Sequence, residues 1–137
     1  MGSKLLVFTD GASRGNPGKA AIAFLICSEE SILERGAKFI GLATNNEAEY
    51  KAAIEALGQV RSKYSNSDVV FHSDSKLLIS QMKGEWKVKE KRLQELHVKA
   101  KSLASGLSSI KYRHVRRTHP MIKKADMMAN HALDRLR

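Results

Sequence analysis

Two aspartates in this sequence follow runs of apolar residues and precede a small residue. Asp10 ends the stretch KLLVFTD before Gly11, and Asp74 ends DVVFHSD before Ser75. Both patterns are typical of a carboxylate at the end of a buried strand. If the two strands are parallel neighbours, the carboxylates meet at one edge of the sheet, where α/β folds bind ligands. Like charges at close range drive one carboxyl toward protonation, and a divalent cation removes that conflict.

A third acid, Glu49, lies on the wrong side of its predicted helix for a solvent-exposed residue. Three, four and seven residues after it come Ala52, Ala53 and Ala56, which belong to the apolar stripe of the same segment. Burying an unpaired carboxylate costs several kcal/mol, in the range of about 2–7 for polar groups and more for charges. A metal shared with the aspartates would compensate.

Asp126 is the fourth candidate, because in the C-terminal helical pattern it falls in register with Leu133 and close to Ala129. Taken singly, each acid is better explained by a turn, a cap or an ion pair. Together, the four favour a metal site. Carboxylates without cysteine or an obligatory histidine suit Mg²⁺ or Mn²⁺ and favour two-metal phosphoryl chemistry over a zinc site.

The elements that must position these acids follow from apolar periodicity and turn residues. Short connections favour an antiparallel meander at the start, and Thr44 with Glu47 has the capping-box spacing of a helix start. The predicted order is three strands, a helix, a strand, two helices, a strand and a helix, which makes an α/β fold around one five-stranded mixed sheet. The predicted strands are 4–10, 20–27, 32–40, 68–74 and 108–115, and the predicted helices 44–64, 75–84, 85–106 and 123–137.

Length and cysteine usage agree with this picture. A chain of 137 residues is expected to form one domain, 1–137, that buries a core without staples, and Cys27 as the only cysteine excludes an internal disulfide. The apolar run AAIAFLIC has eight residues, well short of the roughly 20 of a membrane span. We therefore expect no membrane association and a cytoplasmic location.

The net charge of +10 is concentrated in the second part of the chain. Residues 1–82 hold nine Lys/Arg and nine Asp/Glu, whereas residues 83–137 hold fifteen Lys/Arg and five acids. Such asymmetry favours a polyanionic partner. A solvated basic surface that only maintains solubility is an equally good explanation of the charge alone.

Four segments of the chain, TDGASRGNPG, TNNEAEY, HSDSKLLISQMKGEWKVK and ADMMANHAL, resemble in order and spacing the signature blocks of the type 1 ribonuclease H family. The resemblance implies a ribonuclease H-like fold, with Asp10, Glu49, Asp74 and Asp126 as metal-binding and catalytic carboxylates. The implied reaction is hydrolysis of the RNA strand of an RNA/DNA hybrid, with two Mg²⁺ or Mn²⁺ ions, to 5′-phosphate and 3′-hydroxyl ends.

The resemblance also implies contacts with the substrate. Hydrogen-bonding groups must recognise the 2′-hydroxyl, and a small residue beside Asp10 would let the nucleic acid reach the metals. The basic segment GEWKVKEKR would face phosphates, although packing explains its tryptophan equally well. The chain passes quickly from this segment to the next helix, so the basic protrusion of some family members is short or absent here. We therefore expect weaker binding of the substrate than in those members. The implied contact residues are Gly11, Asn16, Thr44, Asn45, Asn46, Trp86, Lys87 and Lys89.

The stretch RHVRRTHPMIKKAD departs most from the family pattern. His119 is a candidate proton shuttle there, with an ordinary loop histidine as the alternative. Double-stranded RNA is a further candidate partner, and a monomer is expected. Two other functions stay open: a binding module for hybrid or double-stranded RNA that does not cleave, and a polynucleotidyl transferase domain of a larger protein.

Overall fold

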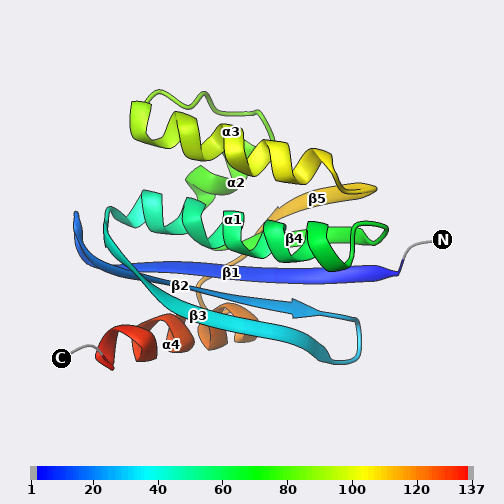
Figure 1. Cartoon of the computed structure of the whole chain (residues 1–137), viewed down its shortest axis with the longest axis horizontal. Helices are drawn as coiled ribbons and strands as arrows, with labels where there is room; N and C mark the ends of the chain where they lie inside the picture. Colours follow the sequence, from blue (N-terminus) through cyan, green and yellow to red (C-terminus); the bar gives the residue numbers. More distant parts are fainter. Residues whose placement is uncertain (1–2, 136–137) are drawn as a thin grey trace.

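The computed structural model describes residues 3–135 and contains, within them, one five-stranded sheet and four helices (Figure 1). Their order along the chain is the predicted one. The strands are β1 Lys4–Gly15, β2 Gly18–Cys27, β3 Ile32–Ala43, β4 Asp68–Ser73 and β5 Ser109–His114. The helices are α1 Asn45–Lys63, α2 Lys76–Met82, α3 Lys91–Ser105 and α4 Pro120–Asp134. No helix in this part of the chain has the length and apolar character to cross a membrane.

The sheet has the strand order β3-β2-β1-β4-β5. β1, β2 and β3 form an antiparallel meander, while β4 pairs in parallel with both β1 and β5. The predicted α/β fold with a mixed sheet is therefore confirmed. The strand β1 is central, and its parallel pairing with β4 brings the ends of these two strands together.

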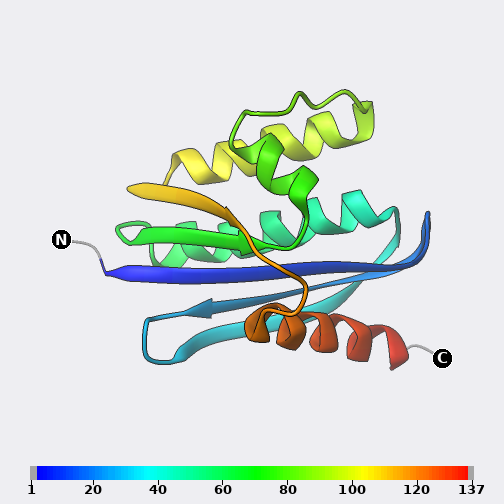
Figure 2. The ribbon, with the colours of Figure 1, turned by 180° about the vertical axis from the view of Figure 1, so that it is seen from behind.

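Helices cover both faces of the sheet: α1, α2 and α3 lie on one side and α4 on the other (Figures 1 and 2). Successive side chains of β1 point alternately to the two faces of the sheet and pack in the two cores. Leu5 and Val7 belong to the core under α1, whereas Phe8 packs in the core under α4 with Ile122 and Ala129. Burial on both faces explains why the start of β1 reads as a continuous apolar run. The connection from β5 crosses to the opposite face to reach α4 (Figure 2).

The bounds of β1 differ from the prediction. We expected the strand to end at Asp10, but residues 11–15 pair with 18–22 of β2 in one long hairpin. The small residues of the segment GASRG allow this pairing, which is a long-range feature that apolar periodicity does not reveal. Asp10 therefore lies inside β1, and only the pairing with β4 ends near it.

The starts of two helices also differ from the prediction: α3 begins later and α4 begins earlier. α3 begins at Lys91 instead of 85, because Gly84 adopts a positive φ of 81° and the residues after it form a connection. Side-chain amides hold this connection: Gln81 Nε2 donates to the Lys87 carbonyl (3.2 Å) and Gln94 Nε2 to the Val88 carbonyl (3.0 Å). α4 begins at Pro120 instead of 123, since proline suits the first helical turn.

Candidate active site

The candidate site lies where β4 ends and β1 continues. The parallel pairing of β1 with β4 stops at Phe8 opposite His72, so beyond this point β1 lacks a partner on that side. Asp10 follows Phe8 by two residues, and Asp74 follows His72 by two residues. The register of the pair therefore places both aspartates at the same open end of the sheet.

Three carboxylates meet at this end. One oxygen from each of Asp10, Glu49 and Asp74 lies within 4.8 Å of the others. They come from β1, from the first turns of α1 and from the junction of β4 with α2. Asp10 is only 5% exposed, and the other two are partly buried.

Two oxygens of this cluster lack the hydrogen bonds that burial normally requires. Asp10 Oδ2 and Asp74 Oδ1 are both buried, and neither accepts a hydrogen bond. An unpaired buried carboxylate is costly unless a cation compensates for it. A set of oxygen donors at this spacing fits a hard divalent ion such as Mg²⁺ or Mn²⁺.

The electrostatics of the three acids show the same conflict. Burial raises the pKa of the Asp10 carboxyl, and the negative charges of Glu49, Asp74 and Asp126 raise it further. Burial, followed by the charge of Asp74, likewise raises the pKa of Glu49. Burial also raises the pKa of Asp74, although the Arg117 guanidinium opposes this shift. A bound cation would favour the ionised form of all three.

Glu49 is held in place by the close approach of α1 to β1. The backbone N–H of Gly11 donates to Glu49 Oε1 at 2.9 Å. A Cβ added to Gly11 would lie 2.3 Å from the carbonyl carbon of Ala48 and 2.5 Å from the Glu49 nitrogen. The space that a side chain would fill thus belongs to α1, so helix packing by itself requires a glycine here, and the predicted contact of Gly11 with nucleic acid stays a prediction.

Asp126 reaches the cluster from the other face of the sheet. It lies on α4, close enough to Asp10 to raise the pKa of that carboxyl, but it is outside the set of three within 4.8 Å. The Asn130 side chain, one turn later, donates to the Asp126 carbonyl (3.0 Å) and to Asp126 Oδ1 (3.2 Å). Four acids from both faces therefore converge where the pairing of β1 with β4 ends.

Basic residues that sequence reasoning did not single out lie beside the acids. His114, Arg116 and Arg117 line a cavity of about 410 Å³ together with Glu49 and Asp74. The Arg117 charge acts on both of these carboxylates, and His114 Nε2 lies 3.2 Å from the Asp74 carbonyl oxygen. The run RHVRR shortly before Asp126 was the available signal, but only the crossing of the β5–α4 connection places it here.

The predicted contact residues near the start of α1 fall into two groups. Asn45 and Asn46 line the same cavity as Glu49 and Asp74. Thr44 caps α1 by accepting from the Glu47 N–H at 3.1 Å, and Asn16 Oδ1 accepts from the Asn45 N–H at 3.0 Å. The predicted helix cap at Thr44 is therefore present, and Asn16 joins the β1–β2 turn to the start of α1.

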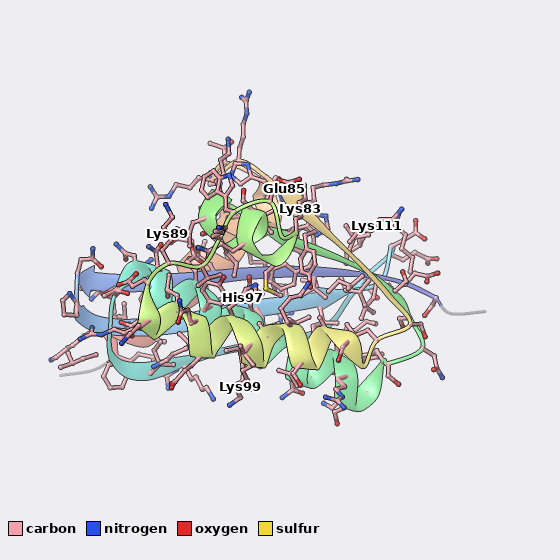
Figure 3. All side chains as sticks on the ribbon, turned by 90° about the horizontal axis from the view of Figure 1, so that it is seen from above. Lys83, Glu85, Lys89, His97, Lys99 and Lys111 are labelled. Atoms are coloured by element: carbon pink, nitrogen blue, oxygen red, sulfur yellow. The ribbon has the colours of Figure 1, made fainter. Side chains whose placement is uncertain are left out.

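Trp86, Lys87 and Lys89 lie apart from the acids. They line a second cavity of about 530 Å³ between α2 and the start of α3, together with Leu77 and Leu93. Trp86 is 46% exposed. Figure 3 shows Lys89 near the start of α3, and Lys83 and Glu85 beside α2.

His119 has mainly structural contacts. Its Nδ1 accepts from the Met121 N–H (3.1 Å) at the start of α4, and its ring packs 5.2 Å from that of Phe8. Within residues 3–135, no hydrogen bond joins His119 to any of the four acids. The structure thus gives His119 a role as helix cap, and its predicted role as proton shuttle stays untested.

Comparison with known proteins is consistent across sequence and structure. A family model described as reverse transcriptase-like matches residues 8–132. The ribonuclease HI of Halobacterium salinarum is 37% identical over 97% of this chain and 66% of its own length. A bifunctional protein of Mycobacterium tuberculosis is 38% identical over 96% of this chain and 36% of its own length. The chain therefore spans only part of these curated relatives.

Two solved structures match this chain over nearly the full length of both proteins. The crystal structure of RNase H1 from H. salinarum superposes with a TM-score of 0.89 at 37% identity, covering 96% of this chain and 98% of that one. LC11-RNase H1, crystallised in complex with an RNA/DNA hybrid, gives a TM-score of 0.88 at 33% identity, covering 95% and 96%. With the fold, the convergent acids and these matches in agreement, the chain belongs to the type 1 ribonuclease H family.

Proposed function

We propose that this protein is an endoribonuclease that hydrolyses the RNA strand of RNA/DNA hybrids and leaves 5′-phosphate and 3′-hydroxyl ends. The observation that carries the proposal is the meeting of Asp10, Glu49 and Asp74 oxygens within 4.8 Å, with buried oxygens that accept no hydrogen bond. Such an arrangement is costly in a protein that has no use for a cation.

The four acids would hold two divalent ions, with Asp126 completing the set from α4. When bound, such ions supply an activated water and stabilise the leaving oxygen of a phosphodiester. The residues of the chain itself hold the geometry: Gly11 fixes Glu49 through its N–H, and the Arg117 side chain adds positive charge beside Glu49 and Asp74.

Substrate recognition would use the two cavities in different ways. The amides of Asn45 and Asn46, next to the acids, can donate and accept hydrogen bonds in a shallow minor groove, where the 2′-hydroxyl distinguishes RNA from DNA. Trp86, Lys87 and Lys89 offer an aromatic surface and positive charges to a phosphate backbone. The existence of a relative in complex with an RNA/DNA hybrid supports this class of substrate.

Double-stranded RNA is a further candidate substrate, and we propose a monomer that acts in the cytoplasm. The main alternative is a module that binds hybrids without cleaving them. The acid cluster disfavours it, because mutually repelling carboxylates at a buried end of the sheet bring no advantage to a protein that only binds.

Cleavage of end-labelled duplexes tests the proposal. RNA/DNA hybrid, duplex DNA and duplex RNA would be incubated with the protein in Mg²⁺, in Mn²⁺ and in EDTA. We expect metal-dependent cutting of the RNA strand of the hybrid and 3′-hydroxyl ends that a polymerase extends. Binding without cleavage under every metal condition would contradict the enzymatic function and support the binding module.

A further inference from the structure

Asn130 occupies a special place on α4, because its side chain joins a candidate catalytic acid to another part of the fold. Its Nδ2 donates to Asp126 O at 3.0 Å and to Asp126 Oδ1 at 3.2 Å. On the opposite side, Arg14 Nη2 lies 3.4 Å from Asn130 Oδ1 and 3.2 Å from the Asn130 carbonyl oxygen. We propose that Asn130 is a positioning residue for Asp126 and that Arg14 fixes the orientation of its amide.

The hydrogen-bonding groups of Arg14 and Asp126 allow only one orientation of the Asn130 side-chain amide. A guanidinium only donates hydrogen bonds, so the group of Asn130 that faces Arg14 must be the oxygen. A carboxylate and a carbonyl only accept, so the group that faces Asp126 must be the NH₂. A rotated amide would oppose donor to donor and acceptor to acceptor. Arg14 thereby ensures that an N–H points at Asp126 Oδ1.

The arrangement connects two acids of the cluster through one contact. Arg14 follows Asp10 by four residues on β1, and Asn130 follows Asp126 by four residues on α4. Arg14 and Asn130 are 116 residues apart in the sequence, so their contact is a tertiary link between the end of β1 and α4. Holding the two elements together at this point fixes the approach of Asp126 to Asp10, and the hydrogen bond to Oδ1 leaves Oδ2 of Asp126 for the cluster.

Arg14 is itself anchored, but by an exposed contact. It forms an ion pair with Asp134 Oδ1 at 2.6 Å, and the two side chains are 47% and 64% exposed. Exposed ion pairs stabilise folded proteins little. Loss of Arg14 should therefore change the position of Asp126 much more than the stability of the fold.

The inference rests on the proposed function, since it assumes that Asp126 acts with the other acids on a metal. Residues that orient metal ligands typically affect metal affinity or activity by about 10–100-fold when removed. The test uses the full chain and two readouts, Mn²⁺ binding by calorimetry in the absence of nucleic acid, and kcat and KM for an RNA/DNA hybrid at several Mg²⁺ concentrations.

Four variants form the set. Asn130→Ala removes the amide, Arg14→Met removes the donor that orients it, and Arg14→Lys keeps a donor. His131→Ala is the matched control, because this exposed residue of α4 is next to Asn130 and outside the site. Melting temperatures in EDTA show whether each variant is folded.

We expect Asn130→Ala to bind Mn²⁺ about tenfold more weakly and to lose about 10–100-fold in kcat, with KM for the hybrid little changed. Arg14→Met should show the same pattern to a smaller degree, whereas Arg14→Lys and His131→Ala should resemble the wild type. Wild-type metal affinity and kcat in folded Asn130→Ala would overturn the proposal, as would a defect confined to KM. If the wild type binds Mn²⁺ but cleaves nothing, the proposed function fails, and the affinities of the variants still decide the role of Asn130.

Discussion

The acidic end of the sheet and the basic connection between α2 and α3, residues 83–90, are built in opposite ways. The acids are carried by β1, α1, α4 and the end of β4, elements whose other side chains form the core. The basic connection is irregular, and its lysines 83, 87 and 89 are exposed. The fold thus fixes the positions of the acids, whereas the lysines project from an irregular segment into solvent.

The two regions also differ in how their polar groups are satisfied. The main chain of the connection is anchored through Gln81, which accepts from the Tyr50 hydroxyl at 2.6 Å and donates to the Lys87 carbonyl at 3.2 Å. The acids retain buried oxygens that accept no hydrogen bond. Buried polar groups without hydrogen bonds thus occur where chemistry is expected, whereas the main chain of the connection, which is expected to bind the substrate, is hydrogen-bonded.

Replacing an acid should have the largest effect. Asp74→Asn keeps the shape of the side chain but removes a charge from the cluster, so we expect a loss of at least about 10³-fold in kcat, equivalent to several kcal/mol of transition-state stabilisation. Single-turnover cleavage of a hybrid measures it. Asp68→Asn, at the exposed start of the same strand, is the matched control and should cleave normally. Activity of Asp74→Asn within tenfold of the wild type would remove the distinction between the two regions.

Replacing Gly11 should disturb the fold at the acidic end. In Gly11→Ala, the new Cβ would lie 2.3 Å from the backbone of Ala48, so α1 must shift, at a cost of about 1–3 kcal/mol in the free energy of unfolding. Urea denaturation measures this cost. The control is Gly58→Ala, in the middle of α1 with open space around it, which should stabilise the protein by up to about 1 kcal/mol. Equal stability of Gly11→Ala and the wild type would contradict the described packing.

The pH dependence of stability without metal should reveal the conflict among the acids. The folded state raises the pKa of Asp10 through burial and neighbouring charges, so the folded protein binds protons more tightly than the unfolded chain. The contribution of Asp10 to stability in EDTA should therefore be greatest below about pH 4 and fall as the pH rises toward about 9.

The variant Asp10→Asn separates this effect from the rest of the protein. At pH 7–8 in EDTA it should be more stable than the wild type by at least about 1.4 kcal/mol, the equivalent of one pKa unit. The difference should close near pH 3–4 and shrink when Mg²⁺ is added to the wild type. Parallel profiles for the two proteins over the whole pH range would show that the cluster carries no electrostatic cost.

Replacing basic residues of the connection should have the smallest effect. We expect Lys87→Ala with Lys89→Ala to weaken hybrid binding by a few-fold and to reduce the salt slope of log K by up to about 1 per phosphate contact, with kcat little changed. Fluorescence anisotropy at several salt concentrations measures this. Lys4→Ala is the control: this exposed lysine at the start of β1 lies outside the connection, so its replacement should have no effect on hybrid binding. A loss of kcat comparable to that of Asp74→Asn would place the connection in the chemical step.

Site residues could be predicted from the sequence where the apolar pattern of their own segment indicates their position. Asp10 and Asp74 were predictable because each follows an apolar run, and Glu49 because it lies beside an alanine stripe. The element order was predicted fully for the same reason. The match of four blocks to one family then identified the fold and the candidate chemistry.

Features that depend on tertiary contacts were not predictable in this way. The extension of β1 to Gly15 needs its pairing with β2, and the link from Arg14 to Asn130 joins residues 116 positions apart. Arg117 gains its place only because the β5–α4 connection crosses to the other face of the sheet (Figure 2). Gly11 was noticed for its small size, but its partner, the backbone of α1, could not be read from its neighbours.

Locating the metal ions in a complex would test directly whether the four acids form a metal site. Crystals of the Asp126→Asn variant with an RNA/DNA hybrid and Mn²⁺ would be measured by anomalous scattering, which identifies the ion independently of the protein density. We expect Mn²⁺ peaks in contact with Asp10, Glu49 and Asp74, next to a phosphate of the RNA strand. A hybrid bound across this end of the sheet with no Mn²⁺ between the acids and the RNA would contradict it.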